Sequence, residues 1–249
     1  MKVVGQPTSP IALHNSLSER VRRLDWDQLS PDLDAHGYAV IEHLLAPKEC
    51  HSLVSLYSRD EIFRNRIVMS RHGFGRGEYQ YFRYPLPGLI EQLRRSVYPH
   101  LVPIANRWNT AMGIEVSYPT THAEFLARCH QAGQDKPTPI ILKYEADDYN
   151  CLHQDLYGPH VFPLQLAILL SNPQADFTGG EFVMTEQRPR MQSRPIVVPL
   201  RQGDGVLFAV HHRPVRGGRG WYRVNLRHGV SRVRSGQRYT VGIIFHDAR

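Results

Sequence analysis

Two histidines and one aspartate of this chain have the residue types and spacing to hold a metal ion together. His153 and Asp155 stand in the run Cys-Leu-His-Gln-Asp, so on a β-strand both side chains would project from one face. His228, in Leu-Arg-His-Gly-Val, could bring a second imidazole from a distant strand. Two imidazoles and one carboxylate on one side of a metal leave positions open for substrate and oxygen, which is typical of non-haem Fe(II) sites. The three residues therefore predict an iron centre with oxidative chemistry.

A pair of residues later in the chain, Arg238 and Thr240, could bind a dicarboxylic acid. Arg238 and Thr240 are two residues apart in Gln-Arg-Tyr-Thr, so on a strand they would share one face. A guanidinium binds a carboxylate through two parallel hydrogen bonds, which a lysine does not. The spacing therefore predicts a carboxylate-binding pair near the metal.

Other histidines compete for the position of the second imidazole. The competitors are His160, His211 and His212. We prefer His228 because only this histidine is followed by an arginine and a threonine at a suitable distance, and we expect the competitors to be surface histidines. The triplet His122-Ala-Glu124 has a similar form, but it falls in an expected helix, and so short a motif occurs by chance.

The second half of the chain has the pattern of β-structure. From residue 140 onward, short apolar runs are separated by clusters of Gly, Pro, Asn and Asp. The runs span 140–144, 151–155, 164–170, 180–185, 196–200, 206–210, 221–228 and 238–245. Eight short strands predict a double-sheet jelly roll, the double-stranded β-helix, which would bring distant ligands together.

The first half is expected to support this core with helices. Residues 1–20 carry two prolines and little apolar pattern, which predicts a loose arm. The expected elements after it are a helix capped at Ser30-Pro31, a strand at 38–41, a helix from 46, a helix at 89–112 interrupted at Pro99 and Pro103, and a helix at 121–131. The organisation predicted is a single domain, with helical support and a substrate lid at 21–139 and the catalytic β core at 140–249.

Residues 59–88 mix arginines, aromatic rings and glycines, and they allow two interpretations. The first is a lid that stacks on a planar substrate such as a nucleobase. The second is a glycine-rich hairpin whose aromatic side chains fill gaps in the core. The pattern alone leaves both open.

Charge and composition narrow the partners and the compartment. The formal net charge is +7, and twelve arginines but only two acids, Glu186 and Asp204, lie between residues 186 and 238. This balance favours nucleic acid as a partner, against the alternative of a solvated basic rim. Three scattered cysteines exclude a disulfide framework, and no run reaches the roughly 18 apolar residues of a membrane span. We therefore expect a cytoplasmic protein with no membrane contact.

Several runs of the chain resemble the Fe(II)- and 2-oxoglutarate-dependent dioxygenases, in the order of that family. The matching runs are Tyr144…His153-Gln-Asp155, Thr178-Gly-Gly-Glu-Phe182, Gln202-Gly-Asp-Gly-Val-Leu-Phe208 and His228-Gly-Val-Ser…Arg238-Tyr-Thr240. The run Arg213-Pro-Val-Arg-Gly and the ending Gly-Ile-Ile-Phe-His-Asp-Ala resemble, more narrowly, a bacterial subfamily catalogued as an oxygenase acting on damaged DNA.

This resemblance implies a cofactor, two cosubstrates and a reaction. Fe(II) would be held by His153, Asp155 and His228, with dioxygen and 2-oxoglutarate as cosubstrates. The far carboxylate of 2-oxoglutarate would pair with Arg238, assisted by Thr240 and Tyr144. The reaction would couple decarboxylation of 2-oxoglutarate to succinate and carbon dioxide with hydroxylation of a substrate C–H bond. Two neighbours are assigned minor roles: Asp204 a turn residue, and Cys151 a small buried hydrophobe.

Three functions compete at this point. The first is oxidative demethylation of an alkylated nucleobase in damaged or single-stranded nucleic acid, which agrees with the arginine-rich run. The second is hydroxylation of a protein side chain of the prolyl type, in which case the basic rim would meet an acidic protein substrate. A non-catalytic cupin-like binding module is disfavoured because it gives no reason for Arg238 and Thr240 beside the metal ligands.

Overall fold

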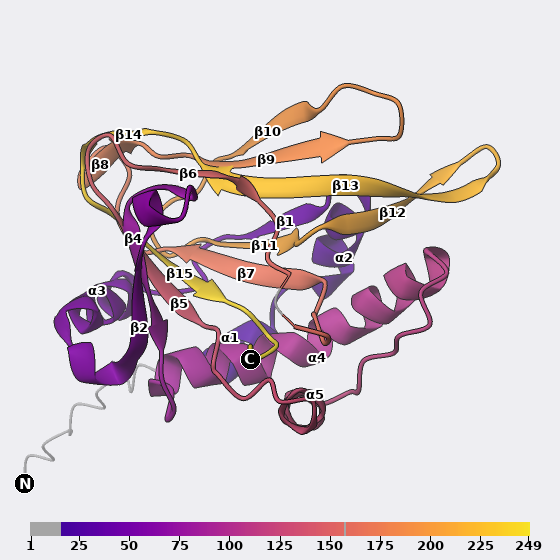
Figure 1. The fold of residues 1–249 in the computed structure, drawn as a ribbon, viewed down its shortest axis with the longest axis horizontal. Helices are drawn as coiled ribbons and strands as arrows, with labels where there is room; N and C mark the ends of the chain where they lie inside the picture. Colours follow the sequence, from indigo (N-terminus) through magenta and orange to yellow (C-terminus); the bar gives the residue numbers. More distant parts are fainter. Residues whose placement is uncertain (1–15, 157) are drawn as a thin grey trace, which may run out of the picture.

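Two facing β-sheets form the core of the computed structural model, which describes residues 16–156 and 158–249 (Figure 1). The larger sheet has the spatial order β1 (Tyr38–Ile41), β11 (Gly205–Ala209), β7 (Leu164–Leu169), β15 (Arg238–Ile243), β5 (Ile140–Tyr144), β4 (Glu78–Phe82) and β2 (Phe63–Val68). The smaller sheet has the order β10 (Arg194–Val198), β9 (Phe182–Gln187), β13 (Gly220–Val230), β6 (Tyr149–His153) and β3 (Gly75–Arg76), and β12 (His212–Gly217) pairs with β13. A two-stranded sheet of β14 (Val233–Gly236) and β8 (Phe177–Gly179) completes the strands. This is the double-stranded β-helix that the sequence predicted.

Five α-helices support the sheets. They are α1 (Leu17–Arg22), α2 (Trp26–His36), α3 (Pro47–Ser55), α4 (Gly88–Ala111) and α5 (His122–Gln131), with 3₁₀ turns at 56–58, 60–62 and 69–71. Figure 1 shows α1, α4 and α5 below the larger sheet, whereas none of the α-helices in the described residues lies above the smaller sheet. None of the helices in the described part of the chain is long and apolar enough to cross a membrane.

The burial of the strands follows from this layering. Every residue of β7 is buried, because the strand has the helices on one side and the smaller sheet on the other. β13 instead alternates, with Leu226 and His228 buried and Arg223 and Arg227 exposed. The buried face of β13 therefore points toward the larger sheet and carries His228 into the space between the two sheets.

The N-terminal helices differ from expectation in two places. Residues 1–15 of the expected loose arm lie outside the described residues, and from Leu17 the chain forms α1, because Leu17 and Val21 bury their side chains in the core. Helix α2 does not start at Ser30-Pro31. It starts after Asp25, whose carboxylate accepts a hydrogen bond from the backbone N–H of Gln28.

Helix α4 continues through Pro99 and Pro103, where we expected interruptions. A proline inside a helix costs about 3 kcal/mol. Buried side chains on every turn from Ile90 to Trp108 offset this cost by packing in the hydrophobic core.

The β-strands show three differences. β6 ends at His153 rather than at Asp155, so these two residues do not share a strand. Strands β8, β12 and β14 are additional, since their glycines and a proline hid the alternation. Residues 59–88 form a hairpin, in which β2 pairs with β4 and β4 pairs with β5. Of its aromatic side chains, Phe63 and Phe82 fill the core, whereas Phe74, Tyr79 and Tyr81 line the cavity.

Candidate metal centre

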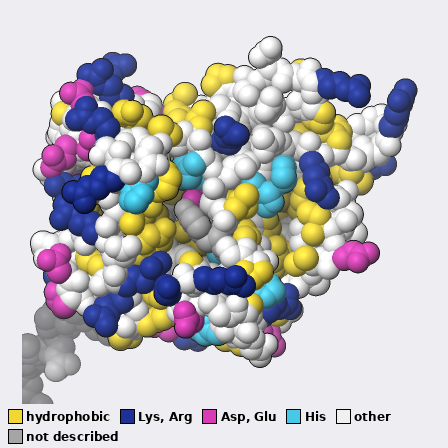
Figure 2. Space-filling view, in the orientation of Figure 1, with side chains coloured by type: hydrophobic (Ala, Val, Ile, Leu, Met, Phe, Trp, Pro, Cys, Tyr) yellow, Lys and Arg dark blue, Asp and Glu magenta, His cyan; other side chains and the backbone are white. Residues whose placement is uncertain are grey.

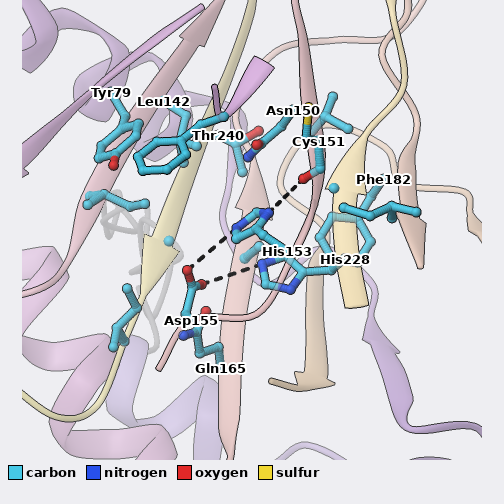
Figure 3. A pocket seen from close by; sticks show the side chains of 18 of the residues that line it. Tyr79, Leu142, Asn150, Cys151, His153, Asp155, Gln165, Phe182, His228 and Thr240 are labelled. Atoms are coloured by element: carbon cyan, nitrogen blue, oxygen red, sulfur yellow. Dashed lines mark hydrogen bonds and ion pairs between the residues drawn. The ribbon is translucent and has the colours of Figure 1, made fainter. Parts of the chain in front are cut away.

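The three candidate ligands converge between the sheets. β6 and β13 are antiparallel neighbours, and His153 pairs directly with His228 in their register. After β6 the chain turns inward, so Asp155 faces both rings: its carboxylate lies 3.5 Å from Nε2 of His153 and 3.4 Å from Nε2 of His228 (Figure 3). One donor atom from each residue falls within 4.8 Å of the others. The geometry therefore has room for one ion bound by all three side chains.

Neighbouring groups orient the two imidazoles. Nδ1 of His153 lies 2.8 Å from the carbonyl oxygen of Cys151, to which it can donate, so Nε2 carries the free lone pair. The ring of His228 packs against Phe208 and Phe182, with centroid distances of 4.6 and 6.1 Å. Both rings therefore present Nε2 to the same point.

The charges of Asp155 and His228 favour metal binding. Burial would raise the pKa of Asp155, but hydrogen bonds from His153 and His228 outweigh burial and hold that pKa well below its usual range. Burial lowers the pKa of His228, and so does the charge of His153. Burial also lowers the pKa of His153, but the hydrogen bond with Asp155 and its negative charge outweigh burial, so the pKa of His153 is raised. An ionised carboxylate and a neutral imidazole are the forms that bind metals.

Other metal-binding types of residue do not form a comparable group. Across residues 16–156 and 158–249, the only cluster of three or more His, Cys, Asp or Glu side chains with this geometry is the one described. The competing histidines at 160, 211 and 212 are half-buried, not on the surface as we expected, and none belongs to the cluster. Two imidazoles with one carboxylate fit a ferrous ion and leave one side of it open.

Arg238 lies in the same cavity without an acidic partner. Its side chain is 1% exposed, and Nη1 donates a 2.6 Å hydrogen bond to the Thr240 hydroxyl. Nε is buried with no hydrogen-bond partner, and the guanidinium makes no ion pair with the described carboxylates. Burial lowers the pKa of Arg238 to about 10, so the side chain remains charged at neutral pH.

The surroundings of Arg238 leave space for an anion. The rings of Tyr144 and Phe177 lie 5.6 and 5.9 Å from the guanidinium carbon. The Tyr144 hydroxyl is buried and makes no hydrogen bond of ordinary geometry. A Cβ at Gly180 would lie 2.9 Å from Cδ of Arg238, so the glycine leaves room for the arginine stem. Buried, unsatisfied polar groups of this kind indicate a missing ligand.

A cavity of about 340 Å³ joins the metal ligands to Arg238. Figure 3 shows Tyr79, Leu142 and Thr240 on the wall opposite the two histidines. Figure 2 shows the same region as a hollow with hydrophobic side chains in it and with Lys and Arg side chains around it. The volume lies in the range of small-molecule sites.

Some residues of the site were not predicted or behave differently. Gln165 lines the cavity beside Asp155, and its amide nitrogen is buried without a partner (Figure 3). The apolar run around it in β7 concealed this position. Cys151 is exposed, not buried as expected, since β6 is near the open side of the cavity. Asp204 is a turn residue as expected, and it accepts hydrogen bonds from the backbone N–H groups of His43 and Arg201.

Comparisons with known proteins agree with this geometry. A model of the family described as "Oxygenase, catalysing oxidative methylation of damaged DNA" matches residues 77–248. An uncharacterized protein of Mycobacterium tuberculosis is 52% identical over 167 residues, which make up 67% of this chain and 72% of that protein.

Two solved structures are similar in fold. An oxidoreductase of the 2OG-Fe(II) oxygenase family from Burkholderia pseudomallei has a TM-score of 0.54 at 14% identity, covering 91% of this chain and 93% of its own. A prolyl-4-hydroxylase from Pseudomonas putida has a TM-score of 0.50 at 13% identity, covering 90% of this chain and 99% of its own. At such low identity these similarities establish the fold alone.

The family match spans most of the chain and includes all three candidate metal ligands and Arg238. The predictions of an oxygenase and of the double-stranded β-helix are confirmed, and the predicted use of Fe(II), 2-oxoglutarate and dioxygen agrees with the family, the fold and the His-Asp-His group. The chain belongs to the oxygenase family that is described as acting oxidatively on damaged DNA.

Proposed function

We propose that the protein is a dioxygenase in which His153, Asp155 and His228 bind Fe(II) and Arg238 binds the distal carboxylate of 2-oxoglutarate. One observation carries this proposal: a buried guanidinium without a carboxylate partner shares a cavity with a His-Asp-His group. Burying an unpaired charge costs several kcal/mol, and a dicarboxylate ligand would recover much of that cost. The anionic ligand and the metal would then meet in one cavity.

The side chains of the site have distinct tasks in this scheme. Bound Fe(II) supplies the oxidising chemistry, coupling decarboxylation of 2-oxoglutarate to oxidation of a substrate C–H bond. Thr240 accepts a hydrogen bond from Arg238 and so fixes the orientation of the guanidinium. The Tyr144 side chain lines the same cavity, and its hydroxyl would donate to the same ligand. Phe182 and Phe208 pack beside His228 and keep water from that side of the metal.

We further propose that the oxidised group is an alkyl substituent of a nucleobase. The description of the family supports a nucleic-acid substrate. The cavity has an aromatic wall of Phe74, Tyr79 and Tyr81, which suits a planar ring. The guanidinium of Arg64 lies 4.2 Å from the centre of the Tyr81 ring and holds that ring in place.

The test is release of succinate from 2-oxoglutarate with a panel of alkylated oligonucleotides and peptides. We expect stimulation by an alkylated oligonucleotide at low salt and loss of that stimulation at high salt. The Asp155→Ala variant should bind no iron and release no succinate, whereas the His211→Gln variant should do both as the wild type does.

Two results would contradict the proposal. Full iron binding by Asp155→Ala would remove the assignment of the metal ligands. Stimulation by peptides alone would replace the nucleobase with a protein side chain as the substrate.

A further inference from the structure

Two β-hairpins project from one end of the smaller sheet. β9 and β10 are joined through residues 188–193, and Glu186 pairs with Arg194 beside that turn. β12 and β13 are joined through residues 218–219, and Gly217 pairs with Gly220. Because Gln187 of β9 pairs with Asn225 of β13, both turns lie at the same end of the sheet. Figure 1 shows the two hairpins projecting side by side at the right.

The tips of these hairpins carry positive charge that no acid balances. Arg190, Arg216 and Arg219, which we call the arginine fork, are exposed and make no ion pair with the described residues. Glu186 is the only acid in either hairpin, and it is buried and already paired with arginines 188, 194 and 213. In Figure 2 only Lys and Arg are coloured as charged at these tips, at the upper right.

An exposed aromatic ring lies beside Arg216 of the arginine fork. Trp221 pairs with Arg216 across the hairpin and is 54% exposed. A tryptophan buries a large apolar area when it stacks, so leaving it exposed forgoes that stabilisation. Unpaired arginines around an exposed ring are the combination that binds unstacked bases and their phosphates.

We propose that the arginine fork and Trp221 bind the flanking segment of a single-stranded nucleic acid whose target nucleotide occupies the cavity. This inference rests on the proposed nucleobase substrate. The charge selects a polyanion, since the fork holds three cations and no free carboxylate. The exposed ring selects a single strand over a duplex, because only unpaired bases offer a free face for stacking.

The distance along β13 sets the length of nucleic acid that both sites can hold. Trp221 and His228 belong to the same strand, seven residues apart, so Trp221 lies on the exposed face of β13 and His228 on the face toward the cavity, and a bound strand would pass from one face to the other at the hairpin end. At about 3.3 Å per residue the separation is roughly 23 Å. A stacked strand rises about 3.4 Å per nucleotide, so at most about seven nucleotides cover that distance, and an unstacked strand covers it with fewer. Shorter oligonucleotides would reach the cavity or the arginine fork, but not both.

The experiment is fluorescence anisotropy with labelled oligothymidylates of about 12 and about 4 nucleotides at low salt. The triple variant Arg190→Gln, Arg216→Gln, Arg219→Gln should bind the longer probe more weakly, and its logarithmic salt dependence should fall by about 2, at about 0.7 per lost contact. Trp221→Ala should bind it about 5- to 140-fold more weakly. Both variants should weaken binding of the shorter probe by a smaller factor than binding of the longer probe, because the shorter probe can still occupy the cavity.

A matched control carries the same loss of charge away from the arginine fork. Lys48, Arg95 and Lys136 are exposed cations outside the two hairpins, and replacing all three by glutamine should leave binding of the longer probe within about twofold. Equal weakening by the control and the fork variant would overturn the proposal. The proposal would also be overturned if poly-glutamate competed for the protein as well as the oligonucleotide does, and if Trp221→Ala did not change the binding of poly-glutamate. An acidic protein would then be the better partner.

Failure of the arginine fork and failure of the proposed function give different results. Iron binding and the stabilisation by 2-oxoglutarate test the metal centre and do not involve the hairpins. Fork variants that keep both properties but bind the longer probe like the wild type would refute the fork alone. Normal binding of the probe by a protein that takes up no iron would refute the proposed function and leave the fork in place.

Discussion

Replacing Arg238 by methionine should stabilise the protein without its ligand and abolish its response to 2-oxoglutarate. Burial lowers the pKa of Arg238 from 12.5 to about 10. That difference corresponds to about 3 kcal/mol against the charged form, at about 1.4 kcal/mol for each pKa unit. Arg238 is protonated in both the folded and the unfolded state at pH 7, so the folded state bears this cost in full at that pH.

Local contacts offset part of the cost. The hydrogen bond to Thr240 contributes about 1 kcal/mol and the ring of Phe177 about 1 kcal/mol, whereas the contribution of Tyr144 is already included in the pKa of Arg238. A net cost of about 1 kcal/mol remains in the ligand-free protein. Methionine keeps the apolar stem and removes the charge, so the variant should unfold about 2–4 °C higher than the wild type.

Thermal unfolding with Mn(II) in place of iron measures both effects without turnover. At about 100 times its Kd, 2-oxoglutarate should stabilise the wild type by about 2.7 kcal/mol, and the Arg238→Met variant by far less. Arg95→Met, at an exposed position on α4, should behave like the wild type in both conditions. An Arg238→Met protein that unfolds at a lower temperature than the wild type and still responds fully to 2-oxoglutarate would refute the reasoning.

Two further predictions concern buried charges away from the cavity. Glu186→Gln removes the carboxylate that pairs with buried Arg213. The free energy of unfolding, measured in urea, should therefore fall by about 3–5 kcal/mol while iron binding is retained. A loss below about 1 kcal/mol would contradict this prediction. Burial lowers the pKa of His122 from 6.5 to about 3, so below pH 6.5 the unfolded state binds the additional proton. The free energy of unfolding should therefore fall by about 1.4 kcal/mol per pH unit from this residue as the pH drops from 6.5 toward 3, and an unchanged pH profile in His122→Gln would contradict the assignment.

Strands that form an apolar run between turn residues could be predicted from the sequence, whereas strands that depend on a partner could not. β5 was predicted with its observed bounds, because an apolar run with one lysine between turn residues has few alternatives. β12 contains Pro214 and ends at Gly217, both of which weaken a strand on their own. It exists because β13 offers a partner along its full length across a tight turn, and such pairing is not visible in a local pattern.

The candidate ligands were identified by residue type, but the reason given for one of them was wrong. We placed His153 and Asp155 together because alternate residues of a strand share a face. In the structure β6 ends at His153, and a turn of the chain brings Asp155 inward. Gln165 was missed because β7 is buried on both faces, and one polar residue in an apolar run gives no sign of which side it faces. The isolation of Arg238 from acids is equally invisible in the sequence, since it depends on every neighbour in space.

The arginine-rich run at 186–238 shows how position in the fold divides one charge pattern into separate functions. Arg213 is buried and holds Glu186 and the backbone of α2, so it stabilises the fold. Arg238 is buried and unpaired in the cavity, which supports a role in binding a small dianion. Arg216 and its exposed neighbours at the hairpin tips make no ion pair with the described residues and remain free for a large polyanion, as do Arg201 and Arg227 elsewhere in the run. Counting charges in the sequence therefore overestimates the nucleic-acid surface, and the two hairpin tips are the part of the run where a test of nucleic-acid binding should be made.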